Sequence, residues 1–218
     1  MNLDRKLTSS RFGLIGGSLS ILFFLCFLTL GFLQPDYNHI RDTISKLVDG
    51  KFGWIQTLNF GILIFSAVFI GFGLKKNIIK NKNILATITF WLCVIELIGV
   101  LIFPADKIIT NYHFGFTSLS LTGKIHYLAA FILIITISMM AFLIIQDMKK
   151  NLYWKKLVPY SYFVLFFNLI FGIIWYYFNE QGFLFEWKGL FQKIIVINIL
   201  VWLVIVGFRL WKLEIKNI

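Results

Sequence analysis

Charged residues are scarce in this sequence of 218 residues: aspartate, glutamate, lysine and arginine together make up 14% of it. Soluble domains carry nearer a quarter, so this composition argues against a soluble protein. The two cysteines, Cys26 and Cys93, both fall inside long apolar runs, which argues against a disulfide framework. The sequence also has no Walker A, Rossmann glycine, HExxH, CxxC or haem motif, and we expect no cofactor.

Long hydrophobic runs take the place of these features. Hydrophobic residues make up 59% of the chain, and six runs reach the ~20 residues that cross a ~30 Å hydrocarbon core. Each run must be a helix, because a backbone amide left unpaired in lipid costs several kcal/mol. The sequence therefore predicts an all-α, polytopic membrane protein, a single bundle of six transmembrane helices. We place the spans at about 12–33, 54–74, 84–103, 125–145, 157–178 and 190–210.

The net charge of +11 is distributed unevenly between the two sides of these predicted spans. One side receives 14 of the 21 basic residues and the other side receives 7. The positive-inside rule then predicts that both chain termini are cytoplasmic. Topology and anionic lipid headgroups explain the basic residues better than nucleic acid does. We expect membrane lipids as partners and no nucleic acid, and a homo-oligomer remains open.

The stretch "QPDYNHIRDTISKL", residues 34–47, follows the first span and lies on the predicted outer side. After Pro35 it predicts a short amphipathic helix, capped by Asp36 or Asn38. The apolar face would carry Ile40, Ile44, Leu47 and Val48, and the polar face His39, Asp42, Ser45, Lys46 and Asp49. The polar face could simply meet water, or Arg41, Asp42 and Ser45 could fold back over the mouth of the bundle. Both interpretations fit the sequence. In the first span, Gly13, Gly16 and Gly17 predict close helix packing.

Glu96 is the most informative single residue, because it lies in the third span roughly 10 Å below its outer end. A lone carboxylate there is costly unless it is paired or protonated, and such residues are functional candidates. We expect Lys193 as its partner, with His126 as the second candidate. Asn59 is another polar residue within a span. A network of polar side chains that only pins the helices together fits the same residues.

Other chemistry on the outer side has weaker support. The third span ends in "FPAD", with Asp106 just outside it. The aromatic-rich loop 104–124 that follows could act as a lid, or it could equally rest on the lipid headgroups. A zinc site built from His39, His113 and His126 lacks any ligand-pair motif, so we expect no metal. A serine nucleophile at Ser45, with His126 and Asp42, also lacks a motif that fixes its geometry.

These residues together resemble a known family. "YNHIRDTISKL", "FPAD", "GKIHYLAA" and "GLFQK" are similar to the domain-of-unknown-function family numbered 998, over about residues 37–193. The resemblance implies a six-span bacterial or archaeal membrane protein, hence a location in the plasma or inner membrane. It marks Arg41, Asp42, Ser45, Pro104, Asp106, Gly123, His126 and Gly189. At Lys193, members of the family often carry arginine.

We therefore expect a polar site in the outer half of the bundle that binds or modifies a lipid-like or small extracytoplasmic molecule. Its catalytic candidates are Glu96, His126 and Asp42, and its substrate-binding candidates are Arg41, Ser45, Asp106, Lys193 and Asn59. Two alternatives are a small proton-coupled transporter and a non-catalytic scaffold or envelope-stress protein. An enzyme and a binding protein both fit these residues.

Overall fold

The computed structural model describes residues 3–79, 83–106, 116, 119–180 and 185–215. Its six long helices are all long and apolar enough to cross a membrane, and the described residues contain no strand. The predicted fold class is therefore confirmed. The long helices are α1 (Leu3–Leu33), α2 (Gly53–Asn77), α3 (Ile84–Ile102), α4 (Leu121–Met148), α6 (Val158–Glu180) and α7 (Lys188–Ile215). The short elements are the 3₁₀ helices η1 (Ile44–Asp49) and η3 (Phe185–Trp187), and the helix α5 (Leu152–Lys155).

Caps fix the helix ends that matter for the site. Ser120 caps α4, because its hydroxyl accepts a hydrogen bond from the backbone N–H of Gly123 at 3.1 Å. As a result, α4 begins before the predicted span start at residue 125. At the other end of the preceding helix, Pro104 follows the C-cap residue Phe103 and cannot continue α3. The backbone N–H of Phe103 still donates to Gly99, but its own carbonyl has no helical partner.

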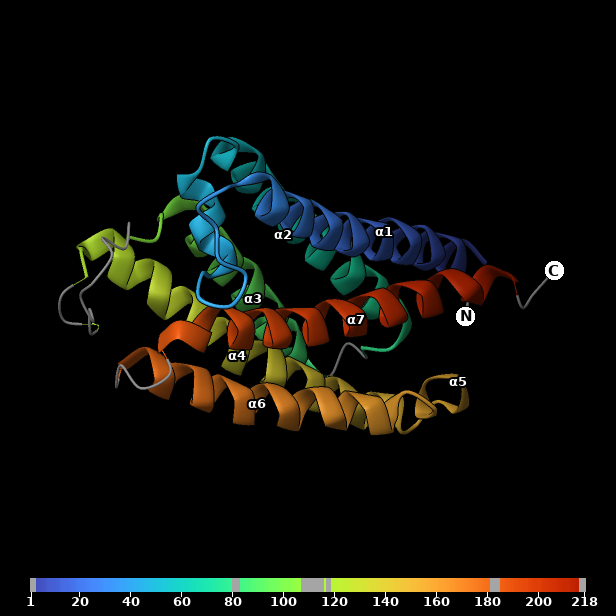
Figure 1. Cartoon of the computed structure of the whole chain (residues 1–218). Helices are drawn as coiled ribbons and strands as arrows, with labels where there is room; N and C mark the ends of the chain where they lie inside the picture. Colours follow the sequence, from blue (N-terminus) through green and yellow to red (C-terminus); the bar gives the residue numbers. More distant parts are fainter. Residues whose placement is uncertain (1–2, 80–82, 107–115, 117–118, 181–184, 216–218) are drawn as a thin grey trace.

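The six long helices form a closed ring in which each packs against the next, in the order α1, α2, α3, α4, α6, α7 (Figure 1). The closest packing is between α1 and its neighbours α2 and α7. Glycines permit it: a Cβ added at Gly207 of α7 would lie 2.9 Å from the Cα of Gly17 in α1. The close packing predicted from the glycines of the first span is therefore present.

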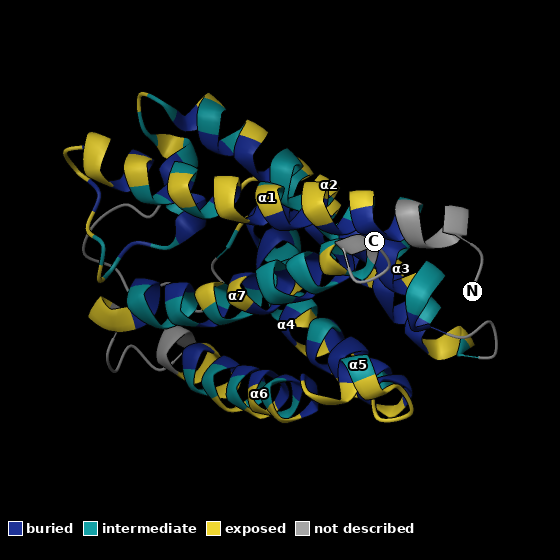
Figure 2. Cartoon of the chain, turned by 90° about the vertical axis from the view of Figure 1, so that its right-hand side faces the viewer, coloured by how far each residue is buried: buried dark blue, intermediate teal, exposed yellow. Residues whose placement is uncertain are grey.

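The surface of the bundle matches a lipid environment. Figure 2 shows exposed residues along the outward faces of the helices and buried residues along the faces that meet. Many of the exposed residues are large and apolar, and Phe65, Ile95 and Ile173 are each more than 60% exposed. A soluble protein would rarely leave so much continuous apolar surface in water. The outward faces are thus suited to contact acyl chains.

Candidate functional site

The segment between α1 and α2 folds back over the end of the bundle opposite the chain termini, here called the η1 end (Figure 1). The ammonium of Lys193 in α7 donates to the carbonyls of Asp42, at 2.5 Å, and His39, at 3.1 Å. The backbone N–H of Leu190 donates to the carbonyl of Ile40 at 2.7 Å. The sequence allowed the polar face of this segment either to meet water or to fold back over the bundle. In the structure, the segment folds back over the bundle.

Close contact with α7 extends this attachment. Gln192 accepts a hydrogen bond from the backbone N–H of Ile44 at 2.8 Å, which holds the first residue of η1. A Cβ added at Gly189 would lie 2.2 Å from the carbonyl oxygen of Asp42, so only glycine allows the segment to approach this closely. Asp42 and Ser45, assigned to the polar face of the predicted helix, are 2% and 9% exposed.

The carboxylate of Asp42 accepts hydrogen bonds from its own segment. One oxygen accepts from the Arg41 side chain at 3.1 Å and the other from the backbone N–H of Asn38 at 2.8 Å. The Arg41 side chain is 32% exposed, so this ion pair reaches from the buried carboxylate to the surface. Asp42 therefore shapes the segment, and Arg41 presents positive charge at the η1 end.

Tyr37 and His39 surround the buried ammonium of Lys193. The Tyr37 hydroxyl donates to the carbonyls of Asp42, at 3.1 Å, and Thr43, at 3.2 Å, and its ring centre lies 5.0 Å from the ammonium. Burial, and then the nearby Asp42 carboxylate, raise the pKa of Tyr37. Burial and the Lys193 charge lower the pKa of His39, although a hydrogen bond with the Gly31 backbone opposes this. Near neutral pH, Tyr37 is therefore a hydrogen-bond donor and His39 is uncharged.

Ser45 and His126 form a buried pair at the centre of the η1 end. The Nε2 atom of His126 lies 2.9 Å from the Ser45 hydroxyl, and Nδ1 lies 2.7 Å from the carbonyl oxygen of Phe103. A carbonyl can only accept, so Nδ1 carries the proton in this arrangement. Nε2 is then free to accept the hydroxyl proton of Ser45. A serine, a histidine base and a group that orients the base are the elements of an activated nucleophile.

The start of α4 holds His126 in place. The Asp106 carboxylate accepts from the backbone N–H of Ser120 at 2.7 Å and from its hydroxyl at 2.5 Å. A Cβ at Gly123 would lie 2.5 Å from the Asp106 carboxyl group, which explains the glycine. Asp106, predicted to bind substrate, thus fastens the cap of α4. Most of the predicted lid, residues 107–115, 117 and 118, and with it His113, lies outside the described residues.

Glu96 lies apart from the Ser45–His126 pair, and its hydrogen-bond partner is neither of the two that the sequence predicted. Its Oε1 atom accepts from the Thr136 hydroxyl at 2.9 Å, and Oε2 has no hydrogen-bond partner in the described part of the chain. Thr136 is ten residues from His126 along α4, or about 15 Å. The predicted ion pair with Lys193 is therefore wrong, as is the second choice of His126. The distance of a residue from the end of its helix gives its depth in the membrane. Which neighbouring helix its side chain faces depends on how the helices pack.

Asn59 lies on α2 and is fully buried. Its amide nitrogen donates to the carbonyl of Phe23 in α1, at 3.1 Å, and to the side-chain oxygen of Gln56, at 3.3 Å. The Oδ1 atom of Asn59 and the Nε2 atom of Gln56 have no hydrogen-bond partner within the described residues. Two fully buried amides with unused polar atoms therefore lie between α1 and the interior of the bundle.

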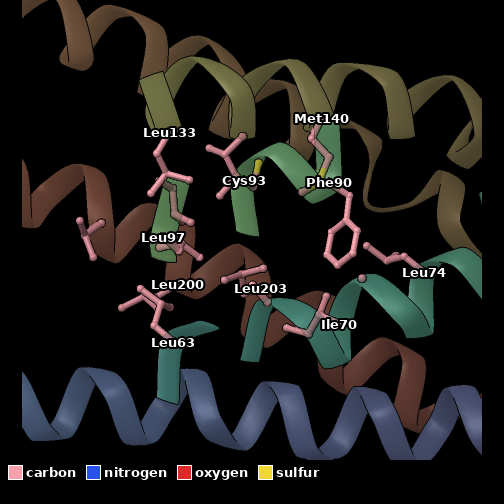
Figure 3. Close-up of a pocket in the computed structure, with 15 residues that line it drawn as sticks. Leu63, Ile70, Leu74, Phe90, Cys93, Leu97, Leu133, Met140, Leu200 and Leu203 are labelled. Atoms are coloured by element: carbon pink, nitrogen blue, oxygen red, sulfur yellow. The ribbon is translucent and has the colours of Figure 1, made fainter. Parts of the chain in front are cut away.

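A small apolar cavity of about 80 Å³ lies between α2, α3, α4 and α7 (Figure 3). Leu97, Leu133 and Leu203 point into it from three different helices, and Cys93 also lines it. In the described part of the chain, no side chain with a charge or with a hydrogen-bonding oxygen or nitrogen lines the cavity. Among the described residues, no three His, Cys, Asp or Glu side chains gather as a metal site would require.

The sequence did not identify the Phe103 carbonyl as a partner of His126, or Gln192 as the partner of Ile44. The signal for Phe103 was present, since Pro104 ends α3 and leaves the preceding carbonyl without a helical partner. Gln192 is polar and near the start of the last span, but nothing in the sequence pairs it with Ile44. Which residues become partners depends on the path that the segment takes in the folded protein.

No curated protein and no solved structure shows significant similarity to this chain. One family does: the family described as "Protein of unknown function (DUF998)" matches residues 19–209, which is most of the chain. The match includes the η1 segment, Ser45, His126, Lys193 and the six helices that arrange them. The chain is a multi-pass membrane protein that belongs to this family, DUF998.

Proposed function

We propose that this protein resides in a bacterial or archaeal plasma membrane and that its η1 end faces outward, with both termini in the cytoplasm. The side of the spans that carries the termini receives 14 of the 21 basic residues, which supports this orientation. The site at the η1 end binds and modifies a lipid-like or small extracytoplasmic molecule. The location within a membrane and the buried polar cluster next to the spans support a lipid-like substrate.

The observation that carries this proposal is the hydrogen bond of 2.9 Å between Ser45 and His126, with Phe103 orienting the imidazole. In this mechanism the Ser45 oxygen bonds to the acyl carbon of an ester as its proton passes to Nε2 of His126. The same proton then protonates the departing alcohol. Water releases the acyl group from Ser45 in a second step. The Phe103 carbonyl, at the negative end of the α3 dipole, stabilises the imidazolium that forms in between.

The other candidate residues take supporting roles in this site. Arg41 is part-exposed and holds its charge at the η1 end, where it can bind an anionic headgroup. Lys193 and Asp42 fix the segment that carries Ser45, the first through the segment's carbonyls and the second through Arg41 and Asn38. They are positioning residues.

A fluorophosphonate probe in proteoliposomes tests the proposal, because such probes react covalently with activated serines. We expect wild-type protein to be labelled, Ser45→Ala to lose the label completely, and Ser138→Ala to keep it. Ser138 is a matched control: it is a buried serine of α4 whose hydroxyl donates to the backbone carbonyl of Ile134. Equal labelling of Ser45→Ala and wild type would contradict the mechanism. An unlabelled wild-type protein would also contradict it and favour the scaffold alternative.

Glu96 supports a second candidate, a proton-coupled transporter. Its side chain lies within the bundle, where ionisable residues mark proton relays, and one carboxyl oxygen has no hydrogen-bond partner among the described residues. Under the main proposal, Glu96→Gln should leave Ser45 labelling within about twofold of wild type. It should also change stability by less than about 1 kcal/mol, since glutamine can still accept from Thr136. Solute uptake that depends on a pH gradient and is lost in Glu96→Gln would instead favour the transporter.

A further inference from the structure

We propose that a polar pocket at the η1 end binds the phosphoethanolamine headgroup of a membrane lipid. The pocket lies between the end of α1, the helix η1 and the residues just before α2. Its volume of about 410 Å³ falls within the range of about 300–1,000 Å³ found for small-molecule sites. The apolar cavity inside the ring, at about 80 Å³, is far smaller. The headgroup site is separate from the mechanism proposed for Ser45 and does not depend on it.

The charges that line the pocket are balanced in sign. Two lysines and two aspartates line it: Lys46, Lys51, Asp36 and Asp49. Lys46 and Asp36 form no ion pair among the described residues, so both can bind a ligand. A simple anion would be repelled by the aspartates, and a simple cation by the lysines. A ligand that carries one group of each sign is therefore the best electrostatic match to this pocket.

Hydrogen bonds and close contacts fix the walls of the pocket. The buried side-chain amide of Gln34 donates to the carbonyl of Leu47 at 2.9 Å, which ties the end of α1 to η1. A Cβ added at Gly50 would collide with the Gln34 amide, so the turn before α2 packs directly against this amide. The Tyr37 hydroxyl is held by two backbone carbonyls of its own segment. The pocket is thus formed before a ligand enters, which lowers the entropic cost of binding.

The position of the pocket favours a lipid over a free solute. Two membrane-spanning helices meet here, since Leu33 is the last residue of α1 and Phe52 directly precedes α2. Leu33 lines the pocket and is also 56% exposed, so the pocket opens beside the apolar surface of α1. Trp54 at the start of α2 is exposed as well, and exposed tryptophans are typical of the headgroup level. A headgroup can therefore enter the pocket while its acyl chains stay in the bilayer next to Leu33.

Phosphoethanolamine has a partner for each sign of charge. Its phosphate can accept from the ammonium groups of Lys46 and Lys51, because lysine binds phosphate as a point charge. Its own ammonium carries three N–H donors, which the Asp36 carboxylate can accept. A choline headgroup has a cation without N–H donors, and a glycerol headgroup has no cation. The pocket should therefore discriminate between lipids that differ only in their headgroups.

Native mass spectrometry of the full protein in mild detergent tests the site. The protein is titrated with three lipids that share palmitoyl and oleoyl chains and carry an ethanolamine, a choline or a glycerol headgroup. We expect the ethanolamine lipid to bind with an apparent Kd about fivefold lower than the other two, the effect of one exposed charge pair. Equal binding of the three lipids would overturn the proposal. Free phosphoethanolamine is titrated as well, and if it bound as tightly as the lipid, it would overturn the lipid as the occupant.

Variants that each remove one charge locate the binding within the pocket. Asp36→Asn should bring the ethanolamine lipid to the affinity of the glycerol lipid, and Lys46→Gln should weaken binding of the ethanolamine lipid by about fivefold. Lys46→Arg keeps the charge and should bind as wild type does, which separates the loss of charge from misfolding. Lys124→Gln and Glu186→Gln are the matched controls, because both residues lie at the η1 end but outside the pocket. Unchanged binding in Asp36→Asn and Lys46→Gln, or equal losses in the controls, would contradict the proposal.

Discussion

Replacing His126 with glutamine should slow fluorophosphonate labelling of Ser45 by about 10²–10⁴-fold, the usual contribution of a general base. Glutamine has an oxygen that can accept from the Ser45 hydroxyl and a nitrogen that can donate to Phe103, so both hydrogen bonds can be kept. What glutamine cannot do is take up the hydroxyl proton. The second-order rate constant, measured from a labelling time course in proteoliposomes, reports this loss directly.

His39→Gln is the control for this experiment. The His39 side chain lies in the same segment as Ser45, but its Nε2 atom has no hydrogen-bond partner in the described part of the chain, and only the His39 backbone carbonyl binds Lys193. We expect His39→Gln to label at a rate within about threefold of wild type, because no base is lost. Similar rates for His126→Gln and wild type would show that the Ser45–His126 hydrogen bond is structural.

The second large effect concerns Gly189, where the η1 segment meets α7. An alanine Cβ at this position would lie 2.2 Å from the carbonyl oxygen of Asp42, and backbone atoms on both sides cannot move aside cheaply. Overpacking of this kind costs about 1–3 kcal/mol. The segment should therefore detach from α7, and hydrogen exchange at residues 38–47 should increase. Since Ser45 would leave His126, fluorophosphonate labelling should fall as well.

Gly61→Ala provides the matched comparison, because a Cβ at Gly61 meets nothing within 4 Å. Both substitutions gain up to about 1 kcal/mol of helix propensity, so the difference between them isolates the contact with Asp42. We expect Gly189→Ala to unfold at a lower temperature than wild type in mild detergent, and Gly61→Ala at the same or a higher one. If the two variants unfold together, the segment is not held by its contact with Gly189.

Some of the features behind these predictions follow from the sequence alone, and others do not. The six helices follow from composition, because lipid forces each apolar run to satisfy its own backbone hydrogen bonds. Close packing of the first span follows from its glycines, since small residues allow backbones to approach. Asp42, Ser45 and His126 could be selected as candidates because they are polar residues next to spans in recognisable motifs.

The partners of these residues were decided by the tertiary structure alone. Glu96 binds Thr136 and not Lys193, because depth in a span does not state which neighbouring helix a side chain faces. Ser45 meets His126 over 81 residues of sequence because the η1 segment folds back onto α7. The cavity left within the ring has no local signal at all. Its lining comes from four helices, and space between side chains exists only once the helices have packed.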